Sequence, residues 1–284
     1  MPVNLVKTFI SASRINFPVS LKIHRDYSLP ASVDSEWCGF FISYSGNTEE
    51  TLSALTEAEA RGMKSIVVMA HGGKLAEIAA EKGYKFVQIP DFNQPRLAYG
   101  YIFGAIIKIF SNSELLEINF NDLISDTEKI SAYNAVIEKR GLELATLLQN
   151  KIGVIYASNQ WKYLAMIWKI NINENAKQPS FWNAFPEMNH NEMVGFTNAA
   201  ERFQAIILRD PSDTPPIQKR MTVFKDLFKD TLQPEIIEMP GASAFYKMLY
   251  CLSLGLWTSY HLAILNQTDP APVELVELFK KSLV

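Results

Sequence analysis

Short apolar runs bounded by turn residues recur along the chain, and longer stretches with helical character separate them. Runs of this length are typical of strands that are buried on both faces of a sheet. The pattern predicts three strands in each half of the chain, at residues 37–43, 65–70, 85–90, 151–158, 202–209 and 234–239. Because strands and helices alternate, we predict an α/β fold in which helices cover parallel sheets in three αβα layers.

The stretches between the strands predict helices at residues 49–61, 74–82, 97–110, 161–171, 217–232 and 244–265. Gly62 and Gly83 follow the first two of these, as glycine commonly does after a helix end. Residues 113–150 are polar and helical and lack strand signals, which predicts a helical linker that packs on both halves. We therefore predict two α/β domains, residues 1–130 and 131–284, with the division near residues 130–150.

Composition supports a globular protein. The chain has 284 residues, of which 48% are hydrophobic and 20% charged, enough for a substantial core. A net charge of -3 gives no reason to expect a nucleic-acid partner. The N-terminal residues lack the apolar core of a signal peptide, so a cytoplasmic protein is expected.

Two further features bear on location. The most apolar stretch, 244–265, contains Lys247 and His261, which predicts a buried or interface helix rather than a membrane span. Cys38 and Cys251 both lie in apolar runs. We interpret them as buried free thiols, as in a reducing compartment.

A loop rich in hydroxyl groups connects the first predicted strand to the first predicted helix, and it reads SYSGNT from Ser43 to Thr48. The first amides of a helix lack partners and the helix dipole is positive there, so a phosphate group is stabilised at this position. The hydroxyls of Ser43, Ser45 and Thr48 can donate hydrogen bonds to it. Gly46 lets the backbone approach an anion closely.

The same loop also fits an ordinary capped turn. Asn47 followed by Glu50 matches an N-cap pair that fixes a helix start. Both interpretations stay open on the residues alone. Glu49 and Glu50 would repel a phosphate, so their side chains are predicted to turn aside.

A dense polar cluster lies in the second half, where residues 186–195 read PEMNHNEMVG. It holds two carboxylates, a histidine and two asparagines, and aromatic residues flank it. Such surroundings can raise the pKa of a carboxyl group and suit it to carrying protons. A polar loop with capping residues would have the same composition, so both interpretations again stay open.

Taken together, the motifs resemble those of sugar isomerase (SIS) domains. The loop SYSGNTEET is similar to the phosphate-binding loop of the bifunctional phosphoglucose/phosphomannose isomerases in particular. Further segments fit that family in the same order: RDYSLP at 25–30, GGKLA at 72–76, QPR at 94–96, PEMNHNE at 186–192, WTSY at 257–260 and DP at 269–270. The resemblance implies two SIS domains in a homodimer with shared active sites. It also implies an aldose–ketose isomerase for sugar 6-phosphates that uses neither cofactor nor metal.

The resemblance also implies roles for single residues. Ser43, Ser45, Gly46, Asn47 and Thr48 would hold the substrate phosphate. The first glutamate of the PEMNHNE segment corresponds to the base that moves a proton between C1 and C2 of the open-chain sugar. That residue is Glu187.

Three more residues complete the implied site, and two others are alternatives. Arg96 would supply a cation to the developing enediol oxygen, and His190 would support the loop or touch sugar hydroxyls. Lys280, with Lys281 beside it as an alternative, would help to open the sugar ring. Glu192 is the less favoured alternative to Glu187 as the base.

Two segments depart from the family pattern. No glycine precedes Gly39, whereas the family has a loop resembling GMGGS that completes the phosphate site. The first domain is therefore expected to lack its opening strand and half of the cradle. Residues 212–220 contain no histidine, although many relatives carry one there. Ring opening would then use His190, His261 or a residue of a second subunit.

These departures support an alternative function, a non-catalytic SIS protein that binds sugar phosphates. Amino-sugar chemistry is a third, less favoured possibility, because the chain has no glutamine amidotransferase domain.

Overall fold

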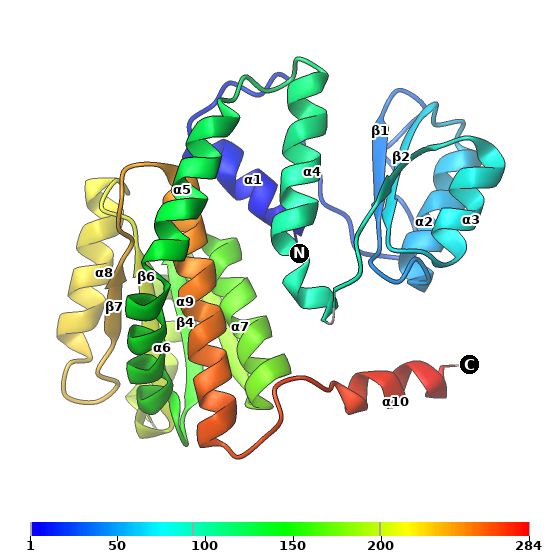
Figure 1. The fold of residues 1–284 in the computed structure, drawn as a ribbon. Helices are drawn as coiled ribbons and strands as arrows, with labels where there is room; N and C mark the ends of the chain where they lie inside the picture. Colours follow the sequence, from blue (N-terminus) through cyan, green and yellow to red (C-terminus); the bar gives the residue numbers. More distant parts are fainter. Residues whose placement is uncertain (1, 93, 199, 284) are drawn as a thin grey trace. The chain divides into compact units, whose positions relative to one another are not determined.

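The computed structural model describes residues 2–92, 94–198 and 200–283, and the chain divides into two compact units (Figure 1). The first unit comprises Met1–Val6 and Phe17–Leu116, and the second comprises Lys7–Asn16 and Glu117–Val284. The predicted boundary at residue 130 lies downstream of this division. Helix α1 (Pro2–Ala12) contributes residues to both units.

The first unit is built on a parallel sheet with the strand order β1-β2-β3. Its elements are β1 (Cys38–Ile42), α2 (Glu49–Ala60), β2 (Ser65–Ala70), α3 (Gly73–Lys82), β3 (Lys85–Gln88), the 3-10 turn η1 (Pro95–Leu97) and α4 (Tyr99–Asn112). Cys38 pairs with Ser65 and Val67 pairs with Lys85. Because the strands are parallel, the loops that follow them all leave from the same edge of the sheet.

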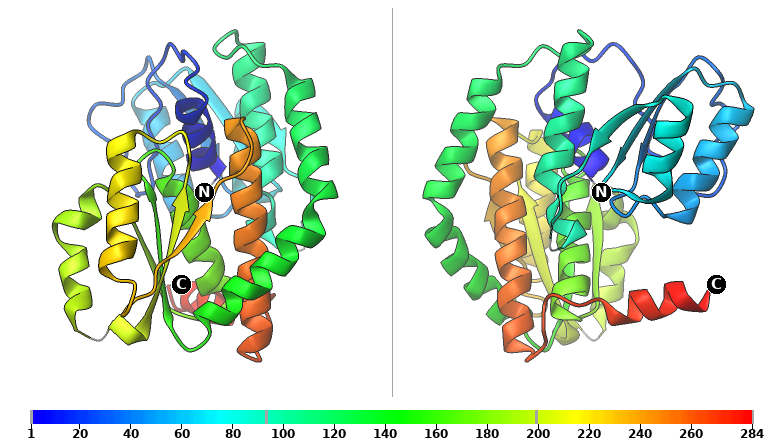
Figure 2. Two further views of the ribbon diagram at one scale, coloured as in Figure 1. Left: turned by 90° about the vertical axis from the view of Figure 1, so that its left-hand side faces the viewer. Right: turned by 45° about the vertical axis from the view of Figure 1, so that its right-hand side comes forward.

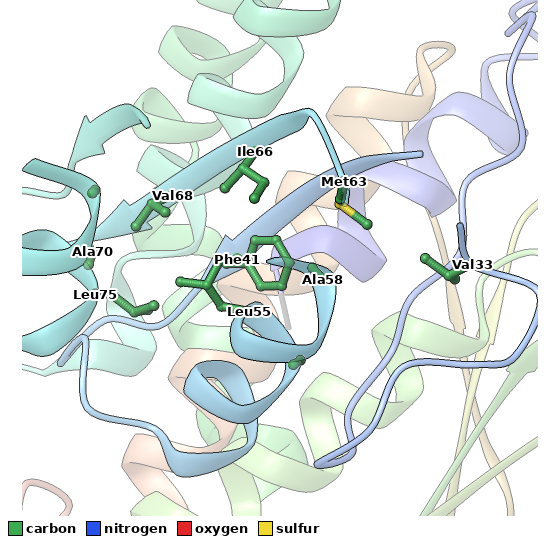
Figure 3. Packing of buried hydrophobic residues seen from close by; sticks show 11 residues of the cluster. Val33, Phe41, Leu55, Ala58, Met63, Ile66, Val68, Ala70 and Leu75 are labelled. Atoms are coloured by element: carbon green, nitrogen blue, oxygen red, sulfur yellow. The ribbon is translucent and has the colours of Figure 1, made fainter. Parts of the chain in front are cut away.

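Apolar side chains of the strands and of two helices form the core of this unit (Figure 3). Phe41 and Val68 come from the sheet, Leu55 and Ala58 from α2, and Leu75 from α3. Full burial of one such leucine or phenylalanine contributes about 1.5–3 kcal/mol. This core fixes α2 and α3 against the sheet, and so fixes the loops that lead into them.

The second unit is built on a parallel sheet with the order β5-β4-β6-β7. Its strands are β4 (Ile152–Ser158), β5 (Ser180–Phe185), β6 (Phe203–Arg209) and β7 (Glu235–Glu238). Its helices are α5 (Phe120–Ala132), α6 (Asn134–Leu148), α7 (Lys162–Ala176), α8 (Pro215–Leu227), α9 (Ala244–Leu265) and α10 (Glu274–Ser282). Three short 3-10 segments lie between β5 and β6: η2 (Glu187–His190), η3 (Glu192–Thr197) and η4 (Ala200–Arg202).

Helices cover both faces of this sheet. Met221 and Phe224 of α8 pack with Tyr156 of β4 and Ile207 of β6 on one face. Helix α9 lies on the opposite side of the sheet (Figure 2), and it packs against α6 and α7. The fold is therefore α/β with parallel sheets flanked by helices, as predicted.

Most of the predicted elements are confirmed, with ends shifted by a few residues. Each of the six predicted strands is present, and residues 113–150 are helical through α5 and α6. The helix predicted at 217–232 ends earlier, at Leu227. Strand β5 was not predicted. It lies at the edge of the sheet, its Phe181 is 56% exposed, and its polar Asn183 breaks the apolar run on which strand prediction depends.

The prediction for the cysteines is half right. Cys251 is fully buried in α9, and burial raises the pKa of its thiol. Cys38, in contrast, is exposed at the start of β1, so the prediction that it is buried was wrong. The apolar run that it opens becomes buried only further along the strand.

Helix α9 is the apolar stretch noted in the sequence. Within the part of the chain that the structure describes, it is the one helix long and apolar enough to cross a membrane, and half of its most apolar window is buried. Its Lys247 is buried too, and its Nζ lies 2.6 Å from Asp210 Oδ1. Asp210 follows β6 and also accepts hydrogen bonds from Trp161 Nε1 (2.9 Å) and the Ser212 amide (2.8 Å). A buried ion pair thus fastens α9 to the carboxyl edge of the second sheet.

Candidate active site

Three hydroxyl groups lie close together in the loop that connects β1 to α2 in the first unit. Ser43 is buried directly after β1, and its amide donates to Met69 O (3.1 Å), which extends the pairing with β2. Its Oγ lies 2.7 Å from Thr48 Oγ1 and 3.5 Å from Ser45 Oγ. Helix α2 begins at the next residue after Thr48. The predicted cluster of hydroxyls at a helix N-terminus is therefore present in the fold.

A second loop braces this one from the side. Asn47 Oδ1 accepts a hydrogen bond from the Lys74 amide (3.0 Å), and the Leu75 amide donates to Gly46 O (3.0 Å). The interpretation of Asn47 as the N-cap of α2, which the sequence left open, is wrong, because its side chain accepts a hydrogen bond from the first turn of α3 instead. Thr48 occupies the N-cap position of α2 and makes no side-chain capping bond. The GGKLA segment at residues 72–76 thus supports the loop of residues 43–48, which we call the hydroxyl loop.

Gly46 is the tightest point of this contact. Its φ is +70°, and a Cβ added there would lie 1.7 Å from Gly72 O. No relaxation of a side chain can relieve a clash with backbone. The loop therefore requires glycine at this position for both space and conformation.

Replacement of Gly46 by alanine is expected to lower the free energy of unfolding by about 2 kcal/mol or more, through combined strain and overpacking. Denaturant unfolding followed by circular dichroism measures this. Gly104→Ala in α4 is the control, because a Cβ there meets nothing within 4 Å. It should be neutral or stabilising by up to about 1 kcal/mol. Equal effects of the two variants would show that the loop tolerates a side chain.

Helix α2, whose first turn carries Glu49 and Glu50, is hydrogen-bonded to the RDYSLP segment upstream of β1. Tyr27 of the RDYSLP segment donates a hydrogen bond from its hydroxyl to Glu49 Oε2 (3.2 Å). Ser53 of α2 donates to Tyr27 O (2.6 Å), and Glu57 accepts from the Leu29 amide (2.6 Å). The side chain of Glu49, which was predicted to turn aside, is therefore bonded to Tyr27 of the upstream segment.

Sequence reasoning missed the role of Tyr44. Its hydroxyl accepts from the Phe92 amide (2.6 Å) and lies 3.2 Å from Asp91 Oδ1, while its ring stacks on His71. Tyr44 thereby joins the hydroxyl loop to the segment after β3. That segment continues to Arg96, which is buried, with Nη1 2.9 Å from Gln94 Oε1. No local pattern marks such a contact, because its partners lie far apart in the sequence.

In the second unit, the predicted base sits on the segment that follows β5. Glu187 opens η2 and is exposed, and its Oε1 accepts a hydrogen bond from Asn191 Nδ2 (3.2 Å). The neighbouring Met188 and the later Phe196 are buried in the core of the unit. An exposed carboxylate on a segment held by buried neighbours is available to a substrate and restricted in position.

Both carboxylate oxygens of Glu192, the alternative base, accept hydrogen bonds. Its Oε1 accepts from the Tyr156 hydroxyl (2.6 Å), and its Oε2 accepts from Asn183 Nδ2. Burial, together with the charge of Glu192, raises the pKa of Tyr156, so this hydroxyl remains a donor. With both oxygens bonded, Glu192 suits a structural role better than a proton-carrying one.

His190 and Lys280 are both exposed. His190 ends η2, three residues after Glu187. Lys280 lies on α10 with Lys281 beside it, and its Nζ lies 2.7 Å from Glu277 Oε1. The nine predicted site residues thus fall into two groups. The hydroxyl loop and Arg96 belong to the first unit, and Glu187, His190 and Lys280 belong to the second.

Comparisons with known proteins identify the family of the chain. Residues 137–283 match the model of the bacterial phospho-glucose isomerase C-terminal SIS domain. A bifunctional phosphoglucose/phosphomannose isomerase of Caldicellulosiruptor bescii is 37% identical over 293 residues, which covers 99% of this chain and 85% of that protein. One of Aquifex aeolicus is 34% identical and covers 91% and 80%. Among solved structures, a hypothetical protein of Thermus thermophilus has the same fold, with a TM-score of 0.74 over 99% of this chain, at 14% identity.

Proposed function

The chain belongs to the family of bifunctional phosphoglucose/phosphomannose isomerases, and we propose that it interconverts glucose 6-phosphate or mannose 6-phosphate with fructose 6-phosphate. The observation that carries this proposal is the similarity over nearly the whole chain to curated isomerases of that name. It is supported by the hydroxyl loop at the start of α2 and by the exposed carboxylate of Glu187.

The proposed chemistry needs one base and one anion-stabilising group. Glu187 would remove the proton at C2 of the open-chain aldose and return it to C1, while a proton moves from the C2 hydroxyl to the C1 oxygen. The intermediate is a cis-enediol, and Arg96 is the cation that we assign to its developing negative oxygen. No net oxidation occurs, because C1 is reduced as C2 is oxidised.

The remaining roles concern binding and ring opening. Ser43, Ser45 and Thr48, with the amides at Gly46 and Asn47, would hold the 6-phosphate. Lys280 would exchange protons with the ring oxygen or the anomeric hydroxyl, and His190 would support the segment or touch sugar hydroxyls. We also propose that the chain has two SIS domains, acts as a cytoplasmic homodimer with shared active sites and serves carbohydrate metabolism.

A coupled assay tests the proposed activity. Fructose 6-phosphate is supplied, and the glucose 6-phosphate formed is oxidised by a dehydrogenase that produces a measurable reduced nicotinamide. Mannose 6-phosphate is tested separately, with an added glucose-6-phosphate isomerase that converts the fructose 6-phosphate formed into glucose 6-phosphate for the dehydrogenase. Turnover of both epimers would support the bifunctional assignment.

The alternative is a non-catalytic sugar-phosphate-binding protein. It is favoured by the lack of a histidine in residues 212–220, which in this chain include a partly buried loop residue, Asp213, and the start of α8. Binding of fructose 6-phosphate by calorimetry without turnover in the coupled assay would support it.

A further inference from the structure

The RDYSLP segment at residues 25–30 belongs to no helix or strand, yet hydrogen bonds hold residues 27–33 along the whole of α2. The side chains of α2 that make these bonds recur every four positions, and residues at that spacing lie on one face of a helix. They are Glu49, Ser53, Glu57 and Arg61. The segment therefore follows α2 from its first residue, beside the hydroxyl loop, to its C-cap.

Arg61 fixes the end of this segment that lies far from the hydroxyl loop. Its Nη1 donates hydrogen bonds to Pro30 O (2.8 Å) and Val33 O (2.7 Å), and its Nη2 donates to Leu29 O (2.9 Å). Glu57 accepts from the Leu29 amide at 2.6 Å. Hydrogen bonds that involve a charged group are about twice as strong as neutral ones. An irregular stretch of backbone is therefore held firmly against α2.

The other end of the segment brings Tyr27 to the start of α2. Ser53 Oγ donates to Tyr27 O (2.6 Å), which fixes the backbone there, and the Tyr27 hydroxyl donates to Glu49 Oε2 (3.2 Å). Desolvation, followed by the charges of Glu50 and Glu49, raises the pKa of Tyr27, so this hydroxyl stays a donor at neutral pH. The carboxylate of Glu49 thus has a donor whose position is set by backbone that α2 itself holds.

The direction of the Glu49 side chain matters because of where Glu49 lies. It is the first residue of α2 and directly follows Thr48 of the hydroxyl loop. Its negative charge complements the helix dipole, but it repels a phosphate group at the same helix end, which carries about -1.5 to -2 charges at pH 7. This repulsion grows as the two charges approach each other. The position of the Glu49 carboxylate therefore affects how tightly the loop can bind a phosphate.

We infer that Tyr27 is a positioning residue for substrate binding, whose hydroxyl holds the Glu49 carboxylate away from a phosphate at the hydroxyl loop. This inference rests on the proposed function, because it takes the hydroxyl loop as the site of the 6-phosphate. The 6-phosphate is remote from C1 and C2 of the sugar, where the bonds change. Tyr27 should therefore act on the affinity for the substrate and leave kcat nearly unchanged.

A double-mutant cycle measures the effect, with the Kd for fructose 6-phosphate determined by calorimetry at low ionic strength. Tyr27→Phe removes only the hydroxyl and frees the Glu49 carboxylate, so Kd should rise about three- to fivefold. Glu49→Gln removes the charge, and its Kd should equal that of the wild type or be lower. In the double variant Tyr27→Phe/Glu49→Gln no charge remains to be held away, so Kd should return to within about 1.5-fold of Glu49→Gln.

A second tyrosine bonded to the same helix supplies the matched control. The Tyr84 hydroxyl donates to Glu59 Oε1 at 2.8 Å, but Tyr84 directly precedes β3 and so lies at the edge of the sheet opposite the hydroxyl loop. Tyr84→Phe should leave Kd unchanged. Added salt separates repulsion from packing, because ions screen exposed charges. The difference in Kd between Tyr27→Phe and wild type should shrink about twofold or more between about 0.02 M and 0.5 M salt.

The outcomes distinguish the role of Tyr27 from the proposed function. A Tyr27→Phe protein with wild-type Kd at low salt would overturn the inference and leave the isomerase assignment standing. A loss of affinity that persists in the double variant, or that salt does not reduce, would overturn it too, because Tyr27 would then act other than through the charge of Glu49. A wild-type protein that binds fructose 6-phosphate without turnover would overturn the proposed activity, and calorimetry would still decide the role of Tyr27. A wild-type protein that binds no sugar phosphate would overturn both.

Discussion

Replacing Glu187 by glutamine is expected to lower kcat by a factor of about 1,000 while fructose 6-phosphate still binds. The loss lies within the range of about 10²–10⁴ that general acid–base catalysis supplies. Glutamine keeps the length of the side chain, and its Oε1 can still accept the hydrogen bond from Asn191 Nδ2. It has no basic oxygen to take a proton from carbon. The coupled assay gives kcat, and calorimetry gives the affinity for fructose 6-phosphate.

Glu201→Gln serves as the control, because Glu201 is an exposed glutamate on the same stretch between β5 and β6. It should retain wild-type kcat. A Glu187→Gln protein that keeps more than about a tenth of the wild-type rate would exclude Glu187 as the base. The base would then have to be sought outside Glu192, whose two oxygens are already bonded.

The parts of this fold that the sequence predicts are those fixed by local chemistry. Strand β2 and helix α9 have the predicted ends, because an apolar run and its flanking turn residues determine both. The hydroxyl loop is equally local, since its serines and Thr48 lie within six residues of one another. A strand that delivers hydroxyls to a helix start can be recognised without knowledge of distant contacts.

The parts that escaped prediction depend on partners far away in the chain. The sequence allowed Asn47 to be the N-cap of the adjacent helix, but its Oδ1 accepts a hydrogen bond from the amide of Lys74, 27 residues further on. Glu192 meets Tyr156, 36 residues before it. A single sequence gives no signal for which of several polar residues will meet across strands. That both oxygens of Glu192 are bonded follows only from the structure, in which Tyr156 of β4 and Asn183 of the adjacent β5 both reach this carboxylate.

The buried ion pair of Lys247 and Asp210 is expected to have a large effect on the stability of the second unit. Replacing Lys247 by methionine is expected to lower the free energy of unfolding by about 3–5 kcal/mol, because it leaves the buried carboxylate of Asp210 without its cation. Urea unfolding followed by fluorescence measures this, since Trp161 and Trp168 are fully buried in the second unit. The double variant Lys247→Met/Asp210→Asn should recover most of the loss, because no buried charge remains and Trp161 keeps an acceptor.

The exposed ion pair of Lys82 and Glu59 supplies the control, at an Nζ–Oε2 distance of 2.5 Å. Solvent screens it, so Lys82→Met should cost at most about 1 kcal/mol. Equal losses in Lys82→Met and Lys247→Met would contradict the view that burial makes the Asp210 pair decisive.

The pH dependence of the Lys247→Met effect follows from the state of Asp210. Burial by itself would raise the pKa of Asp210, but hydrogen bonds from Lys247, Ser212 and Trp161 outweigh it and hold the pKa below its usual value. The unfolded chain therefore takes up this proton first as pH falls below about 4. The stabilisation is complete above that pH and is lost as the pH falls through the folded-state pKa. In Lys247→Met the largest group that lowers the Asp210 pKa is gone, so the pKa of Asp210 is higher in the folded variant than in the folded wild type. As the pH falls, the variant therefore takes up this proton before the wild type does, and the difference in unfolding free energy should shrink from the Asp210 pKa of the variant downward. A difference that stays constant or grows as the pH is lowered from about 8 to about 3 would show that a group other than Asp210 sets it.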